Sequence, residues 1–238
     1  MTASITLGDL HIDVVQKEVK NIHLSVYPPD GRVRIAAPSR IDLETIRVYA
    51  ISKLPWIRQQ QASLLAQERE TEREFLDRES HYFLGRRYLL RLHESSHQQY
   101  VEIDHKYIHL YARPATDKEK KRAILDRWYR NQLHQIIPDM ISKWESKMGV
   151  HCADYGIKRM KTKWGTCNPE ARRIWLNLEL VKKPEPCLEY IIVHELVHLL
   201  ERSHNARFTA YMDKFLPRWR YHRDELNRMP YGHVDWGY

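Results

Sequence analysis

Residues 191–200 read IIVHELVHLL, which places two histidines and a glutamate inside an apolar run. Two prolines precede this run, and its apolar residues recur at helical spacing, so we predict a helix with one buried face. His194 and His198 are four residues apart, about one helical turn, so their imidazoles point to a common place, as a tetrahedral Zn²⁺ requires. Glu195 projects beside them, where it can accept a proton without being a ligand. The stretch therefore predicts a metal site on a helix.

A catalytic zinc ion needs a third protein ligand and keeps one open position. We expect His204 to be this ligand, because it follows His198 by six residues, beyond the expected helix end near residues 202–203. Glu201, on the helix itself, and Glu225, farther along the chain, are alternatives that the spacing leaves open.

Two strands are expected before this helix, at residues 157–163 and 174–180, joined by an Asn-Pro-Glu turn. Lys161 and Lys163 belong to this hairpin and provide positive charge for a phosphate or an acidic substrate, although a solvent-exposed strand face is the commoner role of such residues. A long amphipathic helix is expected to begin before the hairpin with a Thr116–Glu119 capping box.

The N-terminal half has the alternation typical of β-strands. Short strands are expected on both sides of a turn near residues 28–31, followed by a helical stretch over residues 42–73 that Pro55 bends or breaks. Further strands at residues 82–92 and 100–111 are expected to extend the same sheet. The predicted fold class is α+β, with an antiparallel β-rich region and helices in residues 1–115 and a catalytic domain in residues 116–238.

The composition is that of an ordinary globular protein, with 42% hydrophobic and 29% charged residues among 238, which excludes collagen-like and low-complexity chains. The net charge of +8 is a modest excess that favours anionic partners in general. The three cysteines include no CxxC pair, so we expect neither a disulfide framework nor a cysteine zinc site. Without a basic-then-apolar start or a run of about 18 apolar residues, we expect a soluble cytoplasmic protein and no membrane partner.

Four motifs together resemble the YgjP-like family of zinc metallopeptidases, which is related to SprT-like proteases. The resemblance is strongest over residues 157–216 and weaker in the N-terminal half. Its motifs are KWGTC at residues 163–167, IWLNLEL at 174–180, HELVH at 194–198 and SHNARF at 203–208.

The resemblance implies a zincin-like C-terminal domain in which an HExxH helix and a β-hairpin form the active site. It implies that His194, His198 and His204 bind zinc and that Glu195 is the general base. Thr166 stands where the family more commonly has serine, and this change removes no ligand.

The substrate contacts are predicted from residue type and position. Lys161 and Lys163 suit an anionic group, Gly165 allows close approach of a backbone, and Trp164 adjoins it, although a structural turn is the simpler role for these last two. Arg207 follows His204 by three residues and is a candidate oxyanion donor, with packing against the active-site helix as the alternative.

The predicted function is zinc-dependent hydrolysis, with peptide bonds as the expected substrate. An extended peptide can pair with the edge of the predicted hairpin. The alternative is a nucleoside triphosphate (UTP-type) pyrophosphohydrolase, an activity associated with the family. A third possibility is a metal-stabilised nucleic-acid-binding module, for which Glu195 would be dispensable. The sequence leaves open whether Mg²⁺ also takes part.

Overall fold

The computed structural model describes residues 2–27, 30–66, 73–160 and 163–228. The chain forms two compact units, Met1–Glu68 and Arg69–Tyr238. This boundary lies well before residue 116, because the strands of residues 80–112 share one hydrophobic core with the long helix and the elements that follow it. The predicted division after residue 115 would cut through that core.

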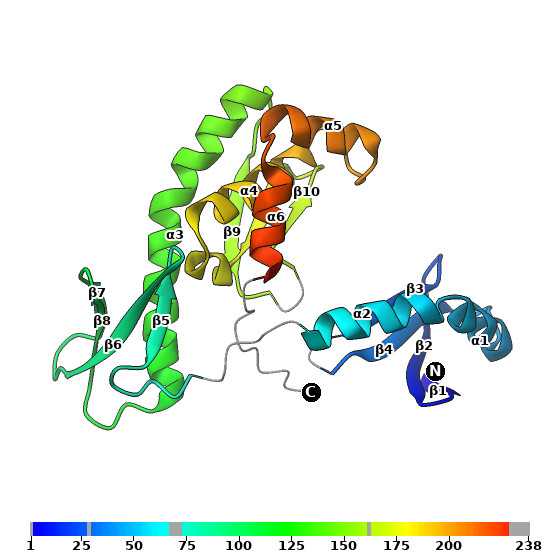
Figure 1. Cartoon of the computed structure of the whole chain (residues 1–238), viewed down its shortest axis with the longest axis horizontal. Coiled ribbons are helices and arrows are strands. Elements are labelled where there is room, and N and C mark those ends of the chain that lie inside the picture. Colours follow the sequence, from blue (N-terminus) through cyan, green and yellow to red (C-terminus); the bar gives the residue numbers. More distant parts are fainter. Residues whose placement is uncertain (1, 28–29, 67–72, 161–162, 229–238) are drawn as a thin grey trace. The chain divides into compact units, whose positions relative to one another are not determined.

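The first unit is a four-stranded sheet with two helices (Figure 1). The strand order is β1-β2-β4-β3, and β2 and β4 run parallel. The helical stretch breaks at Lys53, just before Pro55, which gives two helices. Ile12, Val33 and Ile46 are fully buried in the core of this unit. The elements are β1 (Thr2–Leu7), β2 (Leu10–Lys17), β3 (His23–Tyr27), β4 (Arg32–Pro38), α1 (Leu43–Ser52) and α2 (Leu54–Ala66).

The second unit begins with a sheet of its own, of strand order β5-β6-β8-β7. The sequence had led us to expect that these strands extend the first sheet, and this prediction is wrong. The last strand, β8, lies between β6 and β7. It runs parallel to β6 and antiparallel to β7. Parallel pairs in both sheets correct the prediction of an antiparallel region. The strands are β5 (Ser80–Phe83), β6 (Arg86–Glu94), β7 (Tyr100–Ile103) and β8 (Tyr107–Ala112).

The long helix α3 (Lys118–Met148) packs against β7 and β8 and also against α4, and it crosses the whole second unit in Figure 1. Its N-cap is Asp117, whose carboxylate accepts a hydrogen bond from the Lys120 N–H at 2.8 Å, and not Thr116 of the predicted capping box. Aspartate takes this role because its side chain reaches the exposed N–H groups of the first turn.

A third sheet carries the hairpin. Its strands are β9 (Asp154–Lys158), β10 (Gly165–Asn168) and β11 (Arg173–Asn177), in the order β10-β11-β9. The hairpin is formed by β10 and β11, and the expected strand over residues 157–163 is instead β9, which ends at Lys158 and runs parallel to β11 on its other side. Because β11 ends at Asn177, the chain turns there into the 3₁₀ helix η1 (Leu178–Lys182). The strand β10 is left at the edge of the sheet.

Three helices complete the second unit: α4 (Glu185–Val197), α5 (Ala206–Phe215) and α6 (Trp219–Arg228). The helix α4 is almost wholly buried, because it packs against β10, β11, α5 and α6. Among the described residues, no helix combines the length and the apolar character needed to cross a membrane.

Candidate metal centre

Three histidines converge where α4 ends. His194 lies in the last turn of α4, and His198 caps the helix with dihedrals still in the right-handed helical region. His204 reaches the same place from the segment between α4 and α5. One nitrogen from each ring lies within 4.8 Å of the others, and the Nε2 atoms of His204 and His194 are 2.9 Å apart. Nitrogens at two corners of a tetrahedral zinc site are about 3.3 Å apart, so this trio has the dimensions of such a site.

The end of α4 orients the second imidazole. The Nδ1 atom of His198 lies 3.1 Å from the carbonyl oxygen of Glu201, a contact in which Nδ1–H donates. This hydrogen bond leaves the Nε2 lone pair of His198 for the site. The carbonyl is in place because the chain closes the helix with a bond from the Glu201 N–H to the Val197 carbonyl oxygen at 2.9 Å.

The aromatic ring of Phe208 packs against all three imidazoles. Its ring centroid is 4.9, 4.8 and 4.7 Å from those of His194, His198 and His204, and the residue is only 3% exposed. Asn205 places it there, because this N-cap residue starts α5 by accepting a hydrogen bond from the Phe208 N–H at 3.0 Å. No role was predicted for Phe208 from the sequence, although its position four residues after His204 could have indicated that it lies near this ligand.

The donor set fits a zinc ion. Burial lowers the pKa of His194 to about 3 and also lowers that of His198, so both rings are neutral at physiological pH, as metal ligation requires. The Nδ1 atom of His194 is buried and makes no hydrogen bond within the described part of the chain. Three imidazoles that bring one nitrogen each to a common place suit Zn²⁺ well.

Glu195 lies beside this trio and is 4% exposed. Burial raises the pKa of its carboxyl group to about 8, and the positive charge of Lys163 opposes this shift. A cation held by the neighbouring imidazoles would further favour the carboxylate form. The carboxyl group of Glu195 packs directly on Gly165 of β10. A Cβ atom at position 165 would lie only 2.5 Å from the Oε1 atom of Glu195. Gly165 thus allows the close approach that the sequence suggested, and the group approaching it is the glutamate.

A cavity of about 810 Å³ opens over the histidines and Glu195. Its walls are the edge strand β10 with the turn after it, the end of α4 and the segment that carries His204. Lys163, Trp164 and Gly165 line it, together with the cationic Arg202. The structure thus places three of the five predicted substrate contacts at the cavity.

The remaining candidates are Lys161, Arg207 and the two glutamates. Lys161 is outside the described residues. Arg207 is exposed on α5, where it donates a hydrogen bond to the Tyr211 hydroxyl at 3.2 Å, and it is not part of the described cavity lining. Of the two alternative metal ligands, Glu201 accepts a hydrogen bond from the Ser203 N–H, and Glu225 faces Cys187 and His222. Neither glutamate belongs to the metal-binding group found among the described residues.

The family model that matches this chain is that of the YgjP-like metallopeptidase domain, over residues 20–229. The chain therefore belongs to the YgjP-like metallopeptidase family. Membership of this family implies a divalent metal. A comparison with curated proteins gives no match.

Two solved structures are similar to part of this chain. The metallopeptidase zymogen abylysin of Pyrococcus abyssi is 21% identical with a TM-score of 0.36, and the match covers 38% of this chain and 90% of that one. The metallopeptidase zymogen jannalysin of Methanocaldococcus jannaschii is 23% identical with a TM-score of 0.34, over 38% of this chain and 92% of that one.

Proposed function

We propose that this protein is a zinc-dependent peptidase with a zincin-like active site. His194, His198 and His204 hold the metal, and Glu195 is the general base. The observation that carries the proposal is the convergence of three imidazoles beside a buried carboxyl group, in a cavity bounded by the edge of a sheet. A zinc ion held by these residues would supply Lewis acidity, which would polarise a carbonyl group and lower the pKa of water to about 7.

Glu195 performs the proton transfers. Its carboxylate accepts a proton from the attacking water and then delivers that proton to the amine that leaves. A general base works best when its pKa is close to the working pH, and burial moves the pKa of Glu195 in that direction. Packing against Gly165 restricts the carboxylate to one side of the cavity, so it is oriented before the substrate arrives.

The strand β10 supplies the binding surface for the peptide. It pairs with β11 along one side and lines the cavity, so an extended substrate segment can add to its outer edge. Such binding uses main-chain hydrogen bonds and tolerates many side chains. This supports a polypeptide in extended conformation as the substrate class.

One observation favours a second candidate. Lys163 and Arg202 both line the cavity, and their positive charges suit a triphosphate. Nucleoside triphosphate pyrophosphohydrolysis by the same centre is therefore the alternative function. Replacing Lys161 and Lys163 by alanine is expected to reduce triphosphate turnover far more than peptide cleavage.

The test is to incubate the zinc-loaded protein in parallel with an unfolded protein and with UTP. The Glu195→Gln variant is the control, because it keeps the shape of the side chain and all three histidines. We expect cleavage of the unfolded protein, loss of that activity by a factor of about 100 or more in Glu195→Gln, and equal zinc content in both proteins. Turnover of UTP alone would establish the second candidate, and function unchanged in the variant would favour a binding module.

A further inference from the structure

The segment that leads into β10 decides what faces the catalytic carboxylate. The positive charge of Lys163 counteracts the rise in the pKa of Glu195, and Gly165 packs directly against the carboxyl group. Their position depends on what anchors the chain between β9 and β10.

One side chain, that of Asn177 at the end of β11, anchors both described ends of this segment. Its Nδ2 group donates to the carbonyl oxygens of Met160 at 2.9 Å and Lys163 at 2.8 Å. Its Oδ1 atom accepts from the Met160 N–H at 3.2 Å and from the Glu179 N–H at 3.2 Å. Its backbone N–H donates to the Trp164 carbonyl oxygen at 2.9 Å.

Asn177 is 2% exposed, and these contacts use both amide protons and both lone pairs of the side chain. Since an amide is the only side-chain group that donates twice and accepts twice at these positions, neither aspartate nor leucine can replace it. Removing it would leave the carbonyl groups of Met160 and Lys163 without this partner.

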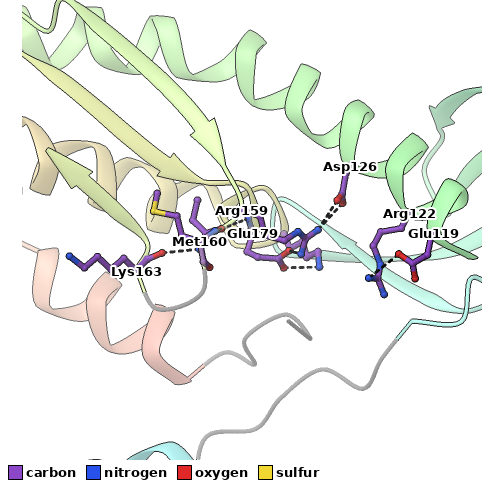
Figure 2. A network of polar contacts seen from close by, with 9 residues as sticks. Glu119, Arg122, Asp126, Arg159, Met160, Lys163 and Glu179 are labelled. Carbon is purple, nitrogen blue, oxygen red and sulfur yellow. Dashed lines mark hydrogen bonds and ion pairs between the residues drawn. The ribbon is translucent and has the colours of Figure 1, made fainter. Parts of the chain in front are cut away.

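A charged network begins at Glu179, whose backbone N–H donates to Asn177, and continues through Arg159 to Asp126 (Figure 2). Glu179, only 3% exposed, forms ion pairs with Arg159 and with Lys182, the latter at 2.7 Å. Arg159 also donates to both carboxylate oxygens of Asp126 on α3, at 2.8 and 2.9 Å. Because Glu179 follows Asn177 by two residues and donates its N–H to it, the asparagine is tied through this network to the long helix.

We propose that Asn177 is a positioning residue for the reaction, which holds the backbone of Lys163 and Trp164 so that Gly165 stands against Glu195. The inference rests on the proposed function for its catalytic consequence. A displacement of about 1 Å at a catalytic group can reduce the rate about 100-fold. Asn177 touches neither the histidines nor the catalytic carboxylate in any hydrogen bond described here, so its effect on catalysis is exerted through the segment.

The experiment compares Asn177→Ala with Tyr129→Phe in the full-length, zinc-loaded protein. The control removes a part-buried hydrogen bond between α3 and β5, from the Tyr129 hydroxyl to the Tyr82 carbonyl oxygen at 2.8 Å. We expect Asn177→Ala to keep its zinc, to lose protection from hydrogen exchange at residues 163–168, and to lose about 100-fold in kcat/KM, mainly in kcat. Tyr129→Phe should lower the melting temperature and leave kcat/KM within a factor of about three.

A double-mutant cycle separates positioning from general destabilisation. Both Asn177→Ala and Gly165→Ala are expected to disturb the contact between Glu195 and β10. If they act through this same contact, kcat/KM of the double variant should be little lower than that of either single variant. Independent, multiplying losses would overturn the proposal. Asn177→Ser, which removes less of the side chain, serves in the same cycle if the alanine variant does not fold.

Two results distinguish this inference from the proposed function. Wild-type kcat/KM in Asn177→Ala, despite faster hydrogen exchange, would overturn the positioning role and leave the peptidase intact. A wild-type protein that hydrolyses nothing would overturn the proposed function. Hydrogen exchange still decides whether Asn177 holds the segment, since equal protection of residues 163–168 in variant and wild type would refute it whatever the reaction.

Discussion

The carboxyl group of Glu195 packs against Gly165 so closely that any side chain at position 165 would collide with it. A Cβ atom there would lie 2.5 Å from Oε1 and 2.8 Å from Cγ of the glutamate. One residue belongs to the helix that carries the histidines, and the other opens the edge strand of the sheet. The contact therefore couples the proposed general base to the surface on which we expect the substrate to lie.

Gly165→Ala is expected to lower kcat by about 100-fold without loss of zinc, because the added methyl group must displace the carboxylate. Steady-state kinetics with an unfolded protein substrate, alongside zinc analysis, measures both quantities. The compensating change is Glu195→Asp, which shortens the side chain. If the collision is the cause, Gly165→Ala should cost much less activity in the Glu195→Asp background than in the wild type.

His204→Ala is expected to reduce the zinc content well below one ion per chain, because two imidazoles from one helix leave the site short of a protein ligand. Zinc is measured in the purified protein by atomic emission. Glu201→Gln is the matched control, since it keeps the backbone carbonyl that accepts from His198 and should retain zinc. Full zinc in His204→Ala would move the third-ligand role to Glu201 or Glu225.

Phe208→Leu is expected to weaken zinc binding about tenfold, because a branched aliphatic side chain does not support three imidazole rings as a flat ring does. Competition with a chelator of known affinity measures the change. Phe215→Leu, on the same helix but half-buried and distant from the metal-binding trio in sequence, should bind zinc as the wild type does. Equal zinc affinity in both variants would show that the ring of Phe208 has no influence on zinc binding.

Acid is expected to destabilise the folded protein through His81, which is 4% exposed. Its pKa is lowered to about 4, mainly by burial, with Glu79 opposing the shift and Arg73 and Lys182 adding to it. The unfolded chain, with a histidine pKa near 6.5, therefore binds the proton more readily, so stability falls as the pH drops from about 6.5 toward 4.

The measurement for His81 is urea denaturation at pH 7.5 and pH 5.0. The free energy of unfolding should decrease more between these values in the wild type than in His81→Gln, which does not titrate there. A pH above 4.5 avoids the protonation of Glu179, whose lowered pKa gives an acid-dependent loss of its own. An identical decrease in both proteins would assign the acid sensitivity to other groups.

Much of the metal centre could be predicted from residues near one another in the chain. The four-residue spacing of His194 and His198 places their rings on one face of any helix, whatever packs around it. The position of His204 just beyond the helix end was sufficient to expect its return, and the structure brings the three rings together. The expected helix appeared as α4 because its apolar residues require burial on several sides.

The strand arrangement could not be obtained in the same way. Alternation predicts that a strand exists but not its neighbour, so the partner of β11 on each side and the parallel pairs in the first two sheets followed only from packing. The strand expected over residues 157–163 ends at Lys158 in the structure, and the backbone N–H and carbonyl groups of Met160 bond instead to the side chain of Asn177.

The amino-acid sequence alone determined the chemistry available to this protein: three imidazoles, one carboxylate and the helix that spaces two of those rings. Such local relations follow from backbone geometry, which is the same in every fold. The tertiary structure decided which residues those groups contact. Phe208 packs against the imidazole rings, Gly165 packs against Glu195, and Asn177 binds the backbone of Lys163. These contacts join residues far apart in the chain, and only the packing of whole elements determines them.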